Sequence, residues 1–266
     1  MKYKTRMLTA SLLFVFVLMQ LPALAANNVI PYPKGYDTIT AGASSYEGKS
    51  NSKESPYFKH PDFYNMKSSA KGLTIISGYK TYQQTTDTSC GPAAALTVLY
   101  HYGVKSFDEL KIAELMGTVN RMRSGSTELG TSTLKMMNFF NALEWNVESS
   151  ITSADKSGVS FNTIGDFSKF VRLKLKGGVP IMVENMYLGG HWRVIIGYDT
   201  MNTPQLQDDV LIYADSYDTN DHNQDGYSVE SLQMFNYTWM DLGMMPADQQ
   251  VQQWITARPP KAKNKH

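Results

Sequence analysis

The chain has 266 residues, of which 42% are hydrophobic and 18% charged, with 19 glycines, 11 prolines and a single cysteine. This composition excludes a collagenous, wholly disordered or disulfide-stapled protein and predicts a soluble globular domain. The formal net charge is +1, because 25 Lys and Arg residues face 24 Asp and Glu residues. A nucleic-acid-binding protein would show a clear basic excess, so we expect no nucleic-acid partner.

The first 25 residues have the three parts of a secretory signal peptide. Basic residues at positions 2, 4 and 6 precede an almost entirely apolar run from Leu8 to Leu18, and Ala23-Leu24-Ala25 has the small-x-small pattern of a cleavage site. A membrane anchor is the alternative, but the apolar run is well short of the roughly 20 residues that span a bilayer. We therefore expect cleavage after Ala25, export to the periplasm or the extracellular space, and no membrane attachment afterwards.

The remaining chain is predicted to contain three parts. Residues 26–71 are rich in Ser, Gly, Lys, Asn and Pro without a sustained period, which is typical of an extended or partly disordered arm. Residues 72–257 have the periodic apolar patterns of one globular domain. Residues 258–266 form a basic tail with two prolines, which we expect to be solvated.

Within the domain, helices are predicted mainly in the first half and strands in the second. A strand is expected at 73–82, followed by helices at 91–102, 106–116, 131–143 and 166–176. Short apolar, β-branched segments then predict strands at 179–184, 192–198 and 210–214, with 254–257 as a further candidate. This order predicts an α+β fold in which the helices pack together beside an antiparallel sheet.

The single cysteine, Cys90, lies at the start of the helix predicted at 91–102. An inert buried thiol is one interpretation, because free cysteine is among the most buried residue types. A nucleophile is the other, because the unpaired N–H groups and the dipole at a helix N-terminus stabilise an anion such as a thiolate. The position at the helix start favours the nucleophile.

Among the five histidines, His191 is the best partner for this thiol. His60 lies in the predicted arm, His266 in the tail and His222 in an Asp-rich loop. His101 shares the helix of the cysteine, but 11 residues of helix place it roughly 16 Å away. His191 follows two glycines and opens a strand, so its imidazole is expected to project from the sheet edge into a cleft and to transfer protons.

Asp215 is the predicted partner of that imidazole. If the strands at 192–198 and 210–214 form a hairpin symmetric about position 203, Asp215 lies opposite His191 and can hold its ring in one tautomer. A turn cap at the strand end is the alternative role for Asp215. The competing carboxylate, Asp199, lies eight residues along the strand, roughly 26 Å from His191.

These residues and their order resemble the papain-like cysteine peptidases of the bacteriocin-leader type. The resemblance covers about residues 82–217 and rests on Gln84, on Cys90-Gly91-Pro92, on Gly190-His191-Trp192 and on Asp215. It implies a papain-like fold, with an N-terminal helical part packed on a C-terminal antiparallel sheet. It also implies a Cys90 nucleophile, a His191 general base and acid, and an Asp215 orienter.

The same resemblance implies an oxyanion hole made by Gln84 and the backbone N–H of Cys90. An amide donor aimed at the developing oxyanion contributes roughly 3 kcal/mol to transition-state stabilisation. The neighbouring residue Gln83 is the alternative candidate for this oxyanion donor. Because neighbouring side chains of an extended segment point to opposite faces, only one of the two glutamines can donate to the oxyanion.

The sequence therefore predicts a secreted bacterial cysteine peptidase that acts on peptide or protein substrates with no cofactor and no metal ion. An acyl or γ-glutamyl-cysteine transferase similar to phytochelatin synthases is one alternative, and a non-catalytic binding relative is the other. Residues 221–226 match positions 1, 3, 5 and 6 of a calcium loop, but Leu232 stands where a Glu is needed. We therefore expect a polar turn there, leading into a helix from Val229.

Overall fold

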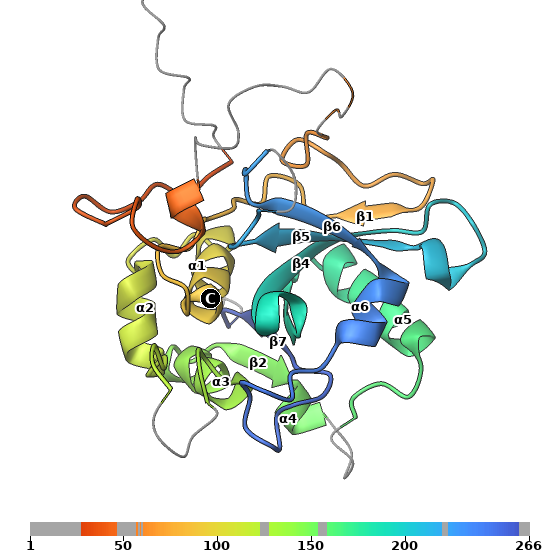
Figure 1. Ribbon diagram of the computed structural model, residues 1–266. Coiled ribbons are helices and arrows are strands. Elements are labelled where there is room, and N and C mark those ends of the chain that lie inside the picture. The colour runs from red at the N-terminus through yellow and green to blue at the C-terminus, as the bar shows by residue number, and fades with distance from the viewer. Residues whose placement is uncertain are drawn as a thin grey trace, which may run out of the picture.

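The computed structural model describes residues 28–46, 57, 59, 61–122, 128–153, 159–219 and 223–260, and it shows helices packed around one sheet (Figure 1). The predicted α+β class is confirmed. The predicted signal peptide, His60, Asp221, His222 and the end of the tail lie outside the described residues. None of the described helices is long and apolar enough to cross a membrane.

Within the described ranges the sheet has seven strands, and every strand pairing in it is antiparallel. Its main order is β2-β7-β3-β4-β5-β6, and β1 pairs with β4 beyond the end of β3. The central strand β4 is buried at every residue except the last. The strands are β1 (Leu73–Ile75), β2 (Asn146–Ser149), β3 (Ile181–Asn185), β4 (His191–Asp199), β5 (Val210–Asp215), β6 (Tyr227–Ser231) and β7 (Trp254–Arg258).

The helices surround this sheet, and α1 and α5 both pack against β4. In Figure 1, α1, α2 and α3 lie on the left of the strands and α5 and α6 on the right. Four of the helices begin after a polar residue whose side chain accepts a backbone N–H of the first turn, which explains where they start. The helices are α1 (Cys90–His101), α2 (Glu109–Met116), α3 (Thr133–Ala142), α4 (Ser150–Ser153), α5 (Ile164–Lys176) and α6 (Leu232–Thr238).

The small residues that follow Cys90 allow α1 to lie deep in the core. Residues 90–99 are all buried, and the run from Gly91 to Ala95 contains no side chain larger than proline. A Cβ atom added to Gly91 would lie 2.8 Å from the Cβ atom of Thr131. Close packing of α1 therefore depends on glycine at this position.

A buried carboxylate at the start of α2 holds the segment that leads into α1. Glu109 is fully buried and accepts hydrogen bonds from Tyr82 Oη at 2.8 Å, from Thr85 N at 2.9 Å and Thr85 Oγ1 at 2.7 Å, and from Ser89 Oγ. Ser89 is the residue directly before Cys90. Glu109 therefore fixes the position of the chain on which the thiol lies.

Two predicted elements are wrong in their extent. The strand expected at 73–82 ends at Ile75, because Gly78 turns the chain with a φ of +70°. The helix expected from Val229 begins at Leu232, because Val229 belongs to β6 and pairs with Ile212 of β5. The predicted elements include no counterpart of β2, β6 or α4.

Described parts of the segment N-terminal to Gly72 belong to the packed unit. Ile30 and Phe63 are buried in the hydrophobic core, with 1% and 7% of their surface exposed. Val29 forms an isolated parallel bridge with Thr81. The packed core therefore includes residues N-terminal to Gly72, although the sequence predicts that the domain starts at residue 72.

Candidate active site

Cys90 and His191 meet where the first residue of α1 faces the first residue of β4. Both side chains are almost completely buried, with exposed fractions of 8% and 3%. The Cys90 side chain acts directly on the pKa of His191, which places the two side chains next to each other. Because Cys90 is the first helical residue, its backbone N–H has no carbonyl partner four residues earlier within the helix.

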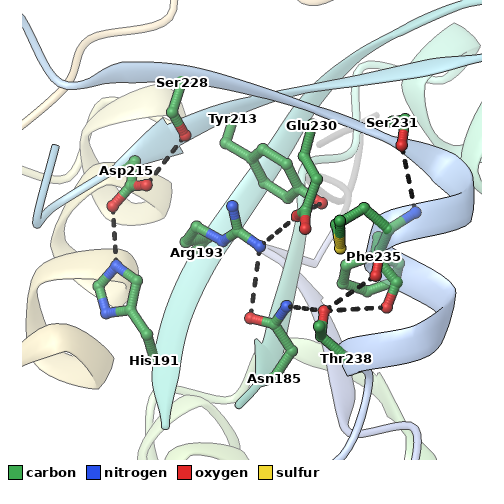
Figure 2. Close-up of polar contacts among 11 residues, drawn as sticks. Asn185, His191, Arg193, Tyr213, Asp215, Ser228, Glu230, Ser231, Phe235 and Thr238 are labelled. Atoms are coloured by element: carbon green, nitrogen blue, oxygen red, sulfur yellow. Dashed lines mark hydrogen bonds and ion pairs between the residues drawn. The ribbon is translucent and has the colours of Figure 1, made fainter. Parts of the chain in front are cut away.

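His191 is held on its other side by Asp215, the last residue of β5. The distance from His191 Nε2 to Asp215 Oδ1 is 2.7 Å (Figure 2). Asp215 also accepts hydrogen bonds from Ser228 Oγ at 2.9 Å and from the backbone N–H of Tyr217 at 3.0 Å. Since Nε2 is bound to Asp215, Nδ1 is the ring nitrogen that remains for Cys90.

The predicted hairpin register is wrong by two residues, although the predicted contact between His191 and Asp215 is present. Asp215 pairs with Arg193, and a bulge shifts the register between Ile195 and Gly197. A shift by two residues keeps a side chain on the same face of the sheet, because the side-chain period of a strand is two. Asp215 therefore reaches His191 as a diagonal neighbour.

The residues around His191 favour the protonated form of its imidazole. Burial by itself lowers the pKa of His191, but the Asp215 carboxylate and the Cys90 side chain outweigh it and raise that pKa to about 9. Burial raises the pKa of Asp215, but His191 and then Arg193 outweigh it and lower that pKa to about 2. At neutral pH the pair is an imidazolium and a carboxylate.

We expect the His191 imidazole to titrate near pH 9, and the Asp215→Asn variant to titrate at a lower pH because its ring loses a negative neighbour. Imidazole C–H signals in NMR spectra recorded across the pH range would measure both midpoints. Since the folded-state pKa lies above the ordinary 6.5, the associated stability is complete below pH 6.5 and disappears as the pH rises through 9. Equal midpoints in the two proteins would contradict the proposed charge interaction.

A buried arginine cluster adjoins Asp215 on the same face of β4 (Figure 2). Arg193 Nη2 lies 2.6 Å from Glu230 Oε2 and 3.3 Å from Asn185 Oδ1. The Arg193 guanidinium also lies over the rings of Tyr187 and Tyr213, at 4.7 Å and 4.0 Å from their centroids. This cluster ties β3, β4, β5 and β6 together and places a positive charge near Asp215.

The two glutamines that are candidates for the oxyanion donor differ in their hydrogen bonds. Gln84 Oε1 accepts a hydrogen bond from Ser216 Oγ at 2.8 Å, and its Nε2 donates one of its two N–H groups to Thr86 O at 2.8 Å. Gln83 is buried, and neither polar atom of its side chain has a hydrogen-bond partner among the described residues. Both glutamines lie in the segment before Cys90.

His101 and Asp199, the alternatives to His191 and Asp215, lie away from Cys90. His101 is at the opposite end of α1 from Cys90, and its Nε2 lies 2.9 Å from Gly178 O. Asp199 lies at the opposite end of β4 from His191 and pairs with Val210. Among the described residues, no group of three His, Cys, Asp or Glu side chains is placed to hold a metal ion.

A pocket of about 110 Å³ opens beside Cys90. Besides the exposed Asp87, it contains two buried acidic residues outside the predicted set, Glu184 and Asp241, which are 2% and 4% exposed. The sequence signal for Glu184 is a charged residue that ends an otherwise apolar strand, whereas Asp241 has no such signal. The pocket is lined by Asp87, Thr88, Cys90, Leu129, Gly130, Thr131, Glu184, Leu188, Gly189, Gly190, Trp192, Asp241, Met244 and Met245.

No curated protein sequence matches this chain. Among solved structures, the chain is similar to the peptidase domain of Streptococcus ComA, a bi-functional ABC transporter involved in a quorum-sensing pathway. That match has 18% sequence identity and a TM-score of 0.41, and it covers 68% of this chain and 99% of the other. The family model described as Peptidase_C39 like family matches residues 76–245, which include Cys90, His191 and Asp215. Because this match spans more than half of the chain, the protein belongs to the Peptidase_C39-like family of cysteine peptidases.

Proposed function

We propose that the protein is an exported cysteine peptidase that hydrolyses amide bonds of peptide or protein substrates through a thioester acyl-enzyme. The observation that carries this proposal is the 2.7 Å contact between His191 and Asp215 directly beside Cys90 at a pocket. Membership of the Peptidase_C39-like family supports the reaction type. The signal-peptide pattern at residues 1–25 supports export.

In the proposed acylation step, the Cys90 thiolate attacks the carbonyl carbon of the scissile bond. His191 is protonated at neutral pH because its pKa is about 9, and it donates its Nδ1 proton to the leaving nitrogen. The C–N bond breaks, the amine product leaves, and the acyl group remains on the sulfur as a thioester. The Asp215 carboxylate stabilises the imidazolium and keeps its ring in position.

In the proposed deacylation step, the now neutral His191 takes a proton from a water molecule that attacks the thioester carbonyl. The C–S bond then breaks, which releases the carboxylic acid and restores the thiolate and imidazolium. In both steps the carbonyl oxygen becomes negatively charged. We assign its stabilisation to the backbone N–H of Cys90 and the amide of Gln84, the donors at the start of α1 and in the segment before it.

Trapping of the acyl-enzyme tests this function. Rapid acid quenching of a reaction with a peptide mixture should give protein whose mass is increased by an acyl fragment on Cys90, together with free carboxylic acid products. The Cys90→Ala variant should give neither. Products whose acyl group is joined to another amine or thiol would indicate a transferase, and intact peptides with no adduct would contradict the proposal.

The two neighbouring glutamines offer a matched control for the oxyanion assignment. Gln84→Ala should slow turnover by roughly 100-fold with little change in KM, because an oxyanion donor acts on the transition state rather than on bound substrate. Gln83→Ala should have a much smaller effect on turnover. If Gln83→Ala is instead the impaired variant, Gln84 is not the oxyanion donor.

A further inference from the structure

Two buried carboxyl groups lie in the pocket beside Cys90 and have no part in the proposed reaction. Glu184 is on β3, where it pairs with Trp192 of β4, and Asp241 follows α6. Asp241 is held by the backbone N–H groups of Gly243 and Met244, which both donate to its Oδ1 at 2.9 Å. Its other oxygen, Oδ2, lies 2.5 Å from where a Cβ atom of Gly190 would be, so glycine at position 190 makes room for it.

Glu184 differs from Glu109, another buried carboxyl group near Cys90. Glu109 accepts hydrogen bonds from four donor atoms, whereas neither side-chain oxygen of Glu184 has a hydrogen-bond partner of normal geometry among the described residues. Burial raises the pKa of Glu184 well above its ordinary value, and the Asp241 and Cys90 side chains raise it further. The backbone N–H of His191 acts in the opposite direction. A positive charge next to Glu184 would lower this pKa and favour its carboxylate form.

Five apolar side chains line the rest of the pocket, together with Asp87, two threonines and three glycines. Leu129, Leu188, Trp192, Met244 and Met245 line the same pocket as the two carboxyl groups. An aliphatic chain that ends in a cation matches this combination, because its methylene groups pack on apolar side chains while its charged end reaches the carboxyl groups. Lysine and arginine are the protein side chains with this construction.

We propose that Glu184 and Asp241 bind the cationic end of a lysine or arginine side chain of the substrate, adjacent to the bond that Cys90 attacks. This inference rests on the proposed function, because it assigns specificity to the same pocket. The substrate class is therefore a peptide with a basic residue next to the cleavage point. The cation supplies the hydrogen-bond donors that Glu184 lacks, and charged hydrogen bonds are about twice as strong as neutral ones.

Thiol-directed peptide chloromethyl ketones of matched sequence test this proposal. One series carries lysine, and the other carries norleucine, which has a similar aliphatic chain without the charge, at the first or the second residue from the reactive group. Intact-mass measurement gives the rate of Cys90 alkylation for each probe. We expect the lysine probe to react about 10-fold faster or more at one of the two positions. Equal rates at both positions, or faster reaction of norleucine, would overturn the proposal.

Substitutions then assign this preference to the two carboxyl groups. In Glu184→Gln and Asp241→Asn, the ratio of the lysine rate to the norleucine rate should fall toward one. Glu114→Gln is a matched control with the same chemical change on an exposed side chain of α2 outside the pocket, and it should keep the wild-type ratio. A wild-type ratio in both pocket variants would show that the carboxyl groups do not bind the cation.

Two further measurements distinguish a failure of the lysine or arginine preference from unfolding of a variant or a failure of the proposed function. Glu184→Gln should unfold at the same or a higher temperature than the wild type at neutral pH, because it removes a carboxyl group whose charged form is disfavoured by burial. The norleucine rate reports whether each variant keeps a reactive Cys90. If neither probe labels Cys90 in the wild type, the proposed function fails, whereas equal labelling by both probes contradicts only the lysine or arginine preference.

Discussion

Cys90→Ala and His191→Ala are each expected to lower kcat by about 10,000-fold or more, which is the range found when a catalytic nucleophile or its base is removed. Cys90 forms the covalent bond to the substrate, and His191 moves the proton in both steps, so no neighbouring group can replace either one. Steady-state kinetics on a cleaved peptide would measure the loss. Far-UV circular dichroism would show that both variants remain folded.

The double variant should lose little more activity than either single variant, because groups that act together are lost together. Asp215→Ala should leave measurable turnover, since Asp215 orients the imidazole but does not contact the reacting atoms. Ser228→Ala, which removes only the 2.9 Å hydrogen bond to Asp215 Oδ2, should have a smaller effect than Asp215→Ala. A fully active Asp215→Ala variant would mean that another residue orients His191.

Glu109→Ala is expected to lower the free energy of unfolding by about 3 kcal/mol or more. The substitution leaves the hydroxyls of Tyr82 and Thr85 and the backbone N–H of Thr85 without their acceptor in a buried site. Ser89 Oγ keeps Thr86 O as its acceptor, at 3.2 Å. Each buried donor that loses its partner costs about 1–3 kcal/mol. Chemical denaturation would measure the change, and the melting temperature should fall by roughly 10 °C.

Glu109→Gln should be less damaging than Glu109→Ala, because it keeps one oxygen acceptor, although its new NH₂ group faces hydroxyl donors. The exposed Glu114→Gln variant again serves as the control, and its stability should stay within about 0.5 kcal/mol of the wild type. A loss below about 1 kcal/mol in Glu109→Ala would show that this carboxylate does not hold the segment before Cys90.

Local patterns in the sequence predict most of the elements and their order. The start of α1 at Cys90 follows from the small residues and the proline of the first turn, and the apolar β-branched runs become β3, β4, β5 and β7. The period of two in a strand also explains why the predicted contact between His191 and Asp215 occurs despite the wrong register. These features depend on residues that are neighbours in the sequence, because local side-chain size and the period of apolar residues decide which helix or strand forms.

Features that depend on distant parts of the chain appear only in the tertiary structure. The bulge between Ile195 and Gly197 alters the register of β4 and β5, and no local pattern marks it. Glu109 meets Ser89 only because α2 packs against α1, and Glu184 meets Asp241 only because the segment after α6 returns to β3. The sequence by itself therefore determined most of the elements and the candidate nucleophile, base and orienter. The tertiary structure alone decided which buried charges share a site, because that depends on packing between residues far apart in the chain.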